Sequence, residues 1–181
     1  MTLLELMVEV ETKIKINTKQ LALATILGAA TWAIKTAFPG VPLDFAIQGA
    51  KIDFGWAPAV LAAVLIGING GLVTGFCISL VPTVPSLFLV GLLWTPWTLA
   101  ATGYLAVNRG WGWKASLVFP LLHIPIGVVV NELIFPAAVV WLVAVPAILV
   151  TEYAGSIVAA VLARYIQRGK ILERIGLWDK N

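Results

Sequence analysis

The sequence predicts an all-α integral membrane protein whose helices cross the bilayer six times. Of its 181 residues, 60% are hydrophobic and only 12% are charged, with a mean hydropathy of +0.97, whereas a soluble domain carries about 25% charged residues. Long apolar runs follow one another between residues 20 and 166. With six spans, nearly all the positive charge falls on one side of the membrane, as expected of a cytoplasmic face. Both termini are therefore expected in the cytoplasm.

The basic residues fall into three clusters, before the first apolar run, in a break midway and at the end. They are Lys13, Lys15 and Lys19, then Arg109 and Lys114, and then Arg164, Arg168, Lys170, Arg174 and Lys180. Of the twelve Lys and Arg residues, this leaves only Lys35 and Lys51. The predicted organisation is a cytoplasmic leader (residues 1–19), a six-helix membrane domain (20–166) and a cytoplasmic tail (167–181), in a multi-pass protein of the plasma membrane.

The first three spans and their connections occupy the first half of the chain. Residues 20–38 are enough for a first span, because a helix rises ~1.5 Å per residue and the hydrocarbon core is ~30 Å thick. Gly and Pro then punctuate an outer loop, residues 39–55, which is long enough to cover a site. Two shorter apolar pieces, residues 56–68 and 72–81, resemble a tight helical hairpin that turns on Asn-Gly-Gly at 69–71 near the inner surface.

The second half of the chain supplies the remaining spans. It is expected to form a fourth span, a cytoplasmic break and a fifth span, over residues 86–107, 108–114 and 115–131. The last apolar tract, residues 133–166, is too long for one span. Because proline interrupts a helix, Pro136 and Pro146 are expected to split this tract into an outer cap segment and a sixth span over residues 147–166.

Polar and ionisable side chains within the predicted spans gather on the outer side of the bilayer, which indicates a substrate pocket open to the outside. Such residues are costly in hydrocarbon and usually face a cavity or the bundle interior. His123 and Asn131 share one face of the fifth span, since they recur at a helical spacing. The candidate substrate-binding residues are Trp32, Lys35, Asp53, Trp56, Trp94, His123, Asn131, Glu132, Glu152 and Tyr153.

Each candidate also has a purely structural interpretation. Lys35 can snorkel to the outer headgroups, and Glu152 can form a structural pair with it. His123 can be a satisfied interior histidine, and with no second histidine in the chain no metal site is expected. Trp94 can be a membrane-belt or core residue instead of a stacking platform. Glu152 is the strongest candidate, because a carboxylate needs a reason to lie inside a membrane.

Small residues on the first span indicate a face for helix docking. One face carries Gly28, Thr31 and Lys35, and nearly the opposite face carries an alanine stripe. Small residues one turn apart let another helix approach closely, although such stripes also pack within a single chain. The alanine stripe consists of Ala22, Ala29, Ala33 and Ala37. The candidate docking residues are Ala22, Ala24, Gly28, Ala29 and Ala33.

The chain lacks the sequence signatures of several function classes. It contains no Gly-x-x-x-x-Gly-Lys-Ser/Thr loop for ATP, no His-Glu-x-x-His and no Gly-x-Ser-x-Gly. We therefore expect neither an enzyme nor a cofactor. The net charge of +3 is explained by the topology, so no nucleic-acid partner is expected. Cys77 is the single cysteine, which excludes a disulfide framework.

Two tracts carry a resemblance to a known family. One is the first span, Leu21-Ala-Leu-Ala-Thr-Ile-Leu-Gly-Ala-Ala-Thr-Trp-Ala. The other begins at Asp53 and reads Asp-Phe-Gly-Trp-Ala-Pro-Ala-Val-Leu-Ala-Ala-Val-Leu-Ile-Gly-Ile-Asn-Gly-Gly-Leu-Val-Thr-Gly. They resemble the alanine-rich first helix, and the second helix, glycine turn and third helix, of the substrate-binding S components of energy-coupling factor (ECF) vitamin transporters, which are ABC transporters. The likeness covers about residues 18–168.

The resemblance implies a high-affinity binding subunit that captures a vitamin or related heterocyclic micronutrient outside the cell. Its partners would be membrane lipid, a membrane coupling subunit that docks on the first helix, and two cytoplasmic ATPase subunits. Ala24-x-x-x-Gly28 or Ala29-x-x-x-Ala33 fills the family's docking pattern. The aromatic and acidic candidates favour a neutral or cationic heterocycle as cargo, and Lys35 keeps a carboxylate-bearing ligand open.

A competing hypothesis is a self-sufficient small secondary transporter or channel. It would use Glu152 and Lys35 as coupling charges and would transport its substrate alone, driven by an ion gradient. The two halves of the chain show no obvious repeat, which argues weakly against an inverted-repeat transporter. An intramembrane enzyme would need a catalytic constellation that the sequence does not contain.

Overall fold

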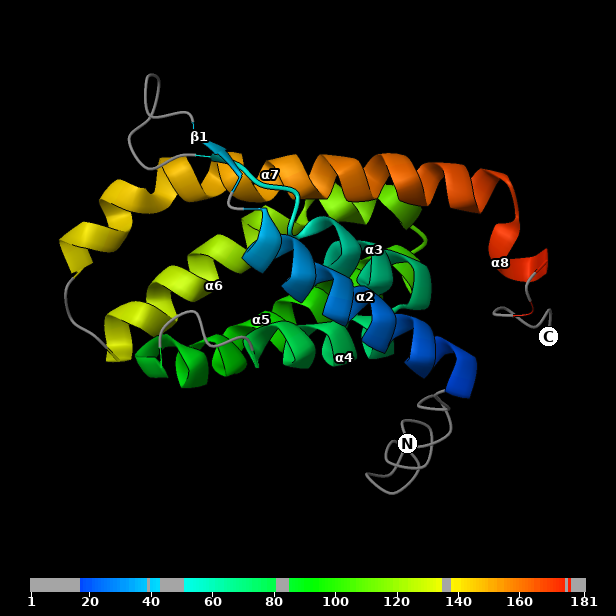
Figure 1. Cartoon of the computed structure of the whole chain (residues 1–181), viewed down its shortest axis with the longest axis horizontal. Helices are drawn as coiled ribbons and strands as arrows, with labels where there is room; N and C mark the ends of the chain where they lie inside the picture. Colours follow the sequence, from blue (N-terminus) through cyan, green and yellow to red (C-terminus); the bar gives the residue numbers. More distant parts are fainter. Residues whose placement is uncertain are drawn as a thin grey trace.

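The structure, a computed structural model, consists almost entirely of helices packed side by side (Figure 1). It describes residues 17–38, 40–42, 51–80, 85–134, 138–174 and 176. To this extent the all-α fold class predicted from the sequence is confirmed. Most of the predicted leader, residues 1–16, and the end of the predicted tail, residues 177–181, lie outside the described residues.

The elements follow the order of the predicted spans closely. The helices are α2 (Thr18–Ala37), α3 (Ala57–Ile66), α4 (Ile68–Ser79), α5 (Pro85–Val107), the 3-10 helix η1 (Gly112–Leu117), α6 (Phe119–Ile134), α7 (Ala138–Arg168) and α8 (Ile171–Arg174). Two short strands between α2 and α3, β1 (Val41–Pro42) and β2 (Lys51–Ile52), pair antiparallel. The bounds of α2 and α5 agree with the predicted first and fourth spans to within two residues.

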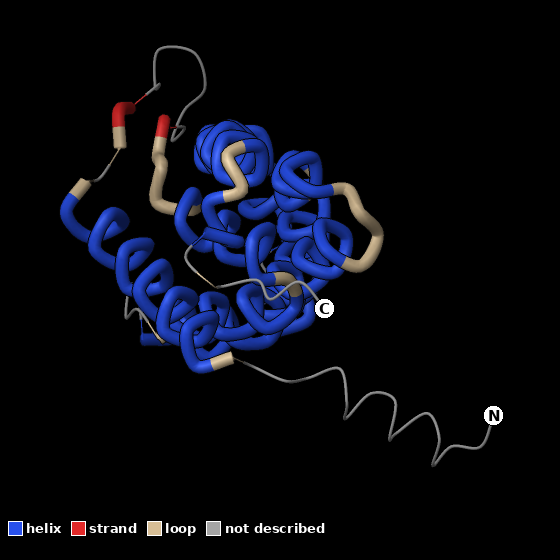
Figure 2. The backbone as a smooth tube through the Cα atoms, turned by 90° about the vertical axis from the view of Figure 1, so that its right-hand side faces the viewer, coloured by secondary structure: helices blue, strands red, loops and turns tan. Residues whose placement is uncertain are grey.

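Helix α3 lies at the centre of the bundle. It contacts α2, α4, α5 and α7, and nearly all of its residues are buried. Its sequence, Ala-Pro-Ala-Val-Leu-Ala-Ala-Val-Leu-Ile, is apolar on every face, as expected of a helix surrounded by others. Figure 2, which looks along several helices, shows them grouped around this common interior. Val60, Val64, Leu99 and Phe119 are among its fully buried side chains.

The turn between α3 and α4 lies at Gly67, so the prediction of a turn at Asn69-Gly70-Gly71 is wrong. Gly67 has φ 86° and ψ −151°, a conformation that is essentially restricted to glycine. Asn69, Gly70 and Gly71 lie inside α4 instead. A Cβ at Gly71 would overlap the backbone of Leu99 on α5. The glycines of this tract therefore serve close helix packing, which sequence alone does not distinguish from a turn.

The predicted break at Pro146 is also absent. Helix α7 is unbroken over its 31 residues, with Pro146 inside it. Proline removes one backbone hydrogen bond and costs about 3 kcal/mol in a helix interior, but packing against neighbouring helices makes it tolerable in apolar helices. Pro96 in α5 and Pro125 in α6 are accommodated in the same way. Pro136 lies outside the described residues.

Two helical segments among the described residues are long and apolar enough to cross a membrane. They are Gly112–Ile134 and Val145–Arg168, which correspond to the predicted fifth and sixth spans. Helices α3 and α4 are apolar but shorter. Large apolar side chains are exposed around the bundle, among them Ile26 at 64%, Val129 at 58% and Leu133 at 79%. Large apolar side chains exposed in this number are typical of a surface that contacts lipid or another protein.

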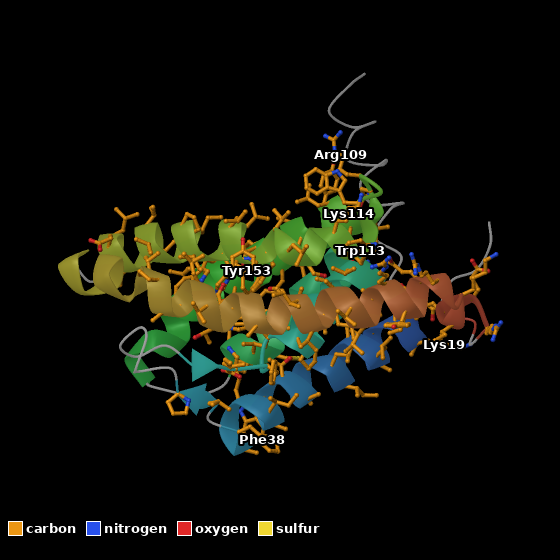
Figure 3. All side chains as sticks on the ribbon, turned by 90° about the horizontal axis from the view of Figure 1, so that it is seen from above. Lys19, Phe38, Arg109, Trp113, Lys114 and Tyr153 are labelled. Carbon is orange, nitrogen blue, oxygen red and sulfur yellow. The ribbon has the colours of Figure 1, made fainter. Side chains whose placement is uncertain are left out.

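The described basic residues other than Lys35 and Lys51 lie at one end of the bundle. Lys19, Arg109 and Lys114 are found at this end in Figure 3, whereas Phe38, at the other end of α2, lies far from them. The end of α7 and helix α8 are at the same end (Figure 1). We call this the basic end. Its residues are Lys19, Arg109, Lys114, Arg164, Arg168, Lys170 and Arg174.

Candidate functional site

Five of the predicted substrate-binding residues meet inside the bundle and form what we call the central site. The five are Lys35, Trp56, Trp94, His123 and Glu152. Each comes from a different part of the chain, because α2, α5, α6, α7 and the residue before α3 supply one each. His123 and Glu152 are only 5% and 4% exposed. Burial of two ionisable groups at one place is the feature that distinguishes this site from the rest of the interior.

His123 is surrounded by aromatic rings. Its ring centroid is 4.9 Å from those of Trp56 and Phe119 and 6.0 Å from that of Trp94. Phe119 was not among the predicted site residues. It precedes His123 by four residues in sequence, so one helical turn separates the two on the same face of α6, and that spacing is the signal that would have found it.

Hydrogen bonds fix the orientation and the tautomer of the His123 ring. Trp94 Nε1–H donates to His123 Nε2 over 3.2 Å. Because an indole N–H can only donate, Nε2 accepts and the ring proton is on Nδ1. That proton is donated to Thr98 Oγ1 at 2.9 Å, and Thr98 in turn donates to the carbonyl oxygen of Thr95. Thr98, one turn after Trp94, was also not predicted.

Glu152 has hydrogen-bonding capacity that its surroundings leave unused. Its Oε1 lies 3.6 Å from His123 Nε2, which is too long for a hydrogen bond. Its Oε2 is buried and has no hydrogen-bond partner among the described residues. A buried polar atom without a partner costs about 1–3 kcal/mol. The carboxyl group is therefore arranged to accept hydrogen bonds that the described residues do not provide.

A small cavity lies beside this carboxyl group, between α5, α6 and α7. Its volume is about 70 Å³, and its lining includes Trp94, His123, Gly127 and Glu152. Gly127 makes room for the indole, because a Cβ at that position would lie 3.0 Å from Trp94 Nε1. Pockets for small ligands usually measure about 300–1,000 Å³. A ligand larger than a few atoms therefore requires the helices around the cavity to move apart.

Lys35 and Trp56 close the site on the side of α2. Lys35 Nζ lies 3.4 Å from the centroid of the Trp56 ring, a cation–π contact. Asp53, which is 6% exposed, accepts a hydrogen bond of 2.7 Å from the Gly55 N–H. This tight turn places Trp56 at the start of α3. Gly155 of α7 lies directly against Trp56, where a Cβ would be 2.9 Å from that of the tryptophan.

Four other predicted binding residues are not part of this cluster as described. Trp32, on α2, is 47% exposed. Tyr153 is half-buried about midway along the bundle (Figure 3) and lies about 100° around α7 from Glu152. Glu132 is half-buried near the end of α6, and its Oε1 has no hydrogen-bond partner among the described residues. The side chain of Asn131 lies outside the described part of the chain.

The candidate docking residues divide between two faces of α2. Ala24 is 1% exposed, and Gly28 lies against α4, where a Cβ would be 2.7 Å from that of Cys77. These two positions are covered within the chain and do not face a partner. The other three candidates are exposed: Ala22, Ala29 and Ala33. Of the two small-residue pairs read from the sequence, only Ala29-x-x-x-Ala33 lies on the surface.

Neither metal ligation nor similarity to known proteins assigns a role to the central site. Among the described residues, no group of three or more His, Cys, Asp or Glu side chains is placed to hold a metal ion. No family model, curated protein or solved structure matches the chain. What the site does must therefore be inferred from its own residues, which are a buried carboxyl group, an oriented imidazole and two indoles.

Proposed function

We propose that the chain is the membrane-embedded substrate-binding S component of an ECF-type importer and that the central site holds its cargo. In this arrangement α2, α3, α4, α5, η1 with α6, and α7 are the six spans, and the basic end faces the cytoplasm. The exposed apolar side chains and the gathering of basic residues at one end support it. Helix α3 is short, but the helices that surround it exclude lipid from its ends.

The unpartnered carboxyl group of Glu152 is the observation that carries this proposal. A buried acceptor with no partner is costly, and ionisable residues within membrane helices usually serve function. A ligand that donates N–H groups to Glu152 would remove this cost. Trp94 lines the cavity beside His123, and Trp56 packs against the same imidazole; indole rings of this kind stack on aromatic ligands. The favoured cargo is a neutral or cationic heterocycle with N–H donors, such as a vitamin or its precursor.

Cargo entry requires the site to open, because the cavity of about 70 Å³ is smaller than such a ligand. The segment between α2 and α3 is the natural gate. Its strand β2 contacts α7, and Lys35 and Trp56 flank it on the two helices that it connects. Movement of this segment would uncover Trp56 and the cavity from the outer side.

Delivery of the cargo requires partners in this proposal. The chain has no ATP-binding loop of the Walker type, so separate ATPase subunits would power transport. The exposed alanines Ala29 and Ala33 would dock a membrane coupling subunit, since small side chains let helices approach closely. Ala24 is buried and Gly28 packs against α4, so these two residues are not proposed for this role.

Native mass spectrometry of the purified protein in detergent tests the proposal. After incubation with a panel of water-soluble vitamins and nucleobases, we expect one small molecule retained per chain. Glu152→Gln should weaken binding of that molecule about 10-fold to 100-fold, because a hydrogen bond to a charged group is worth about 1.5–3 kcal/mol. The matched control Glu132→Gln changes the same group on α6, outside the central site, and should leave affinity unchanged.

Two outcomes would overturn this assignment. If no molecule of the panel is retained, the chain is not a high-affinity binding subunit. If the purified chain alone, in liposomes, drives uptake that depends on an ion gradient and is lost in Glu152→Gln, the secondary transporter is correct instead.

A further inference from the structure

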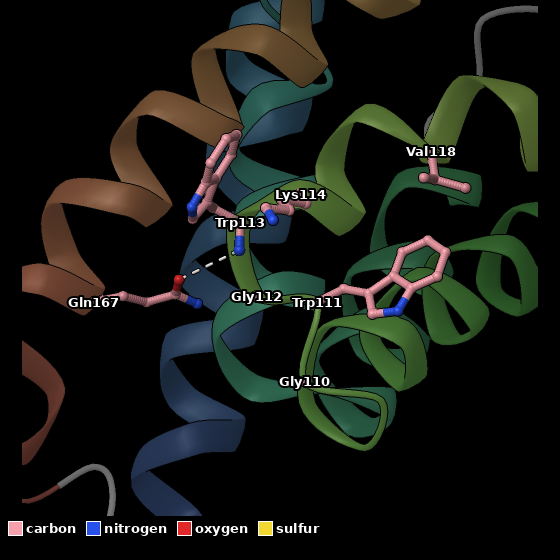
Figure 4. Close-up of a pocket in the computed structure, with 7 residues that line it drawn as sticks. All are labelled: Gly110, Trp111, Gly112, Trp113, Lys114, Val118 and Gln167. Atoms are coloured by element: carbon pink, nitrogen blue, oxygen red, sulfur yellow. Dashed lines mark hydrogen bonds between the residues drawn. The ribbon is translucent and has the colours of Figure 1, made fainter.

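A second, larger hollow lies on the surface at the basic end, between η1 and the last turns of α7 (Figure 4). Its volume is about 660 Å³. We call it the basic groove, and its lining residues that matter here are Trp111, Trp113, Lys114, Val118 and Gln167. A smaller hollow of about 310 Å³, lined by Val161, Arg164, Tyr165 and Arg168, lies on the same part of α7. The central site shares no residue with either hollow.

The walls of the basic groove are held by specific contacts. The backbone N–H of Trp113 donates to Gln167 Oε1 over 3.3 Å (Figure 4). With its oxygen engaged, Gln167 has its NH₂ group left to donate, and no described residue accepts from it. The guanidinium of Arg164 lies 5.4 Å from the centroid of the Trp113 ring, which joins the two hollows into one surface. This surface therefore combines a fixed amide donor with an ordered aromatic ring.

The charge that the described residues give this surface is positive. Lys114, Arg164 and Arg168 are all exposed. Within the part of the chain that the structure describes, none of the three pairs with a carboxylate. Lys114 and the Gln167 amide line the basic groove, and Arg164 and Arg168 line the smaller hollow beside it. Cations and an amide donor on one surface favour an anion with several acceptor oxygens, which is the chemistry of a phosphate group.

The neighbouring surface indicates where that phosphate comes from. Leu121, one turn beyond the groove on α6, is 57% exposed, and Val161 on α7 is 49% exposed. Trp111 and Tyr165 are exposed at the rim, and such amphipathic aromatic residues favour the headgroup level of a bilayer. A ligand that carries both a phosphate and apolar chains matches both parts of this surface, whereas free phosphate matches only the first.

We propose that the basic groove binds the headgroup of an anionic phospholipid. The phosphate contacts Lys114 and the Gln167 amide in the groove, Arg168 of the smaller hollow adds positive charge beside it, and the acyl chains follow the apolar surfaces of α6 and α7. This site requires the chain to be in a membrane with its basic end at the headgroups. It does not depend on the identity of any cargo, so it can be tested independently of the central site.

Lipid retention in native mass spectrometry tests the site. The protein in detergent is mixed with equal amounts of phosphatidylglycerol and phosphatidylcholine, and bound lipid is counted. We expect phosphatidylglycerol to be retained preferentially. Lys114→Gln and Arg168→Gln should each weaken its binding about fivefold, and the double variant roughly 25-fold, because each surface cation contributes a similar increment. Both side chains are exposed, so these variants should fold normally, which size-exclusion chromatography checks.

Lys19→Gln is the matched control. It removes the same charge at the same end of the bundle but on a different side of the molecule from Lys114 (Figure 3), and it should leave lipid binding unchanged. Equal retention of both lipids overturns the proposal, as does an equal loss in Lys19→Gln and Lys114→Gln, which would reflect net charge alone. Displacement of the lipid by excess inorganic phosphate also overturns it, since the groove would then be a site for the free anion.

Discussion

His123 organises the central site at the scale of single residues. Its Nε2 accepts a hydrogen bond from Trp94 and also faces the carboxyl oxygen of Glu152 at 3.6 Å. One nitrogen cannot accept from the indole and donate to the carboxyl group at the same time. The neutral His123 ring therefore leaves Glu152 available to a ligand. The Trp94 N–H and the His123 imidazole satisfy each other, and the Glu152 carboxyl group buried beside them does not take part in that hydrogen bond.

The polar role of His123 can be separated from its packing. His123→Phe preserves the aromatic contacts but leaves the Trp94 N–H without an acceptor and Thr98 without a donor. We expect a lower free energy of unfolding, by about 1–3 kcal/mol for each buried group that loses its partner, measured by thermal unfolding in detergent. Thr98→Val in the same background should recover part of this loss. Strictly additive effects of the two substitutions would contradict the hydrogen bond between them.

Gly127 provides a second prediction at this scale. A Cβ at Gly127 would lie 3.0 Å from the Trp94 indole, so Gly127→Ala should displace the ring, weaken its bond to His123 and lower stability by about 1–3 kcal/mol. Gly91→Ala on α5 is the control, because among the described residues its Cβ would meet only Ser79 Oγ, at 3.8 Å. Comparison of the two melting temperatures is the measurement. An equal effect of both would show that helix propensity, and not Trp94, determines the result.

At the scale of elements, the connection between α3 and α4 depends on one residue. Gly67 is the whole link between the two helices, and its positive φ lets the chain reverse where any other residue would be strained. Asn69 and the two glycines after it, which look like the turn in the sequence, are already helical. The element boundary is therefore set by backbone conformation, and the glycines beyond it serve packing, Gly70 against α3 and Gly71 against α5.

Substitution distinguishes these two interpretations of the hairpin. Gly67→Ala should lower the free energy of unfolding by about 1–3 kcal/mol, the cost of placing a side chain in this conformation. Asn69→Ala should change it by less than about 0.5 kcal/mol, since alanine is a better helix former and the position is inside α4. Thermal unfolding of both variants in detergent is the check. The reverse order of the two effects would place the turn at Asn69 after all.

At the scale of the whole molecule, the separation of charge from the central site defines an orientation. The basic end contains the described Lys and Arg residues apart from Lys35 and Lys51. Lys35 instead contacts Trp56, at the opposite end of α2 from Lys19. A membrane placed around the bundle would therefore have its cytoplasmic face at the basic end and the entrance to the central site on the other side.

Cysteine labelling of intact cells tests this orientation. The chain has a single cysteine, Cys77, so Cys77→Ser provides a background without thiols. Phe38→Cys should react with a membrane-impermeant maleimide added outside, whereas Lys19→Cys and Arg109→Cys should react only after the membrane is permeabilised. All three positions are exposed, so differences in labelling report the side of the membrane. Labelling of Lys19→Cys or Arg109→Cys in intact cells would reverse the proposed orientation.

The sequence predicted most of the helices, and half of its candidate binding residues meet in the central site, for identifiable reasons. The length and apolar composition of two runs were enough to predict the bounds of α2 and α5. The ionisable residues Lys35, His123 and Glu152 were recognisable because hydrocarbon does not tolerate them without a purpose. Phe119 and Thr98 were missed because an aromatic or a threonine in an apolar helix is ordinary, and only their contacts with His123 make them part of the site.

By itself, the sequence determined the properties that depend on composition and spacing. These are the helical class, the apolar exterior, the basic end and the face of α2 that carries Gly28, Thr31 and Lys35. Only the tertiary structure decided which helices meet. It placed the turn at Gly67 and kept α7 continuous through Pro146. It also covered Gly28 with Cys77 and left Glu152 Oε2 without a hydrogen-bond partner among the described residues. These outcomes depend on neighbours distant in sequence, because packing and hydrogen bonding across helices have no fixed spacing along the chain.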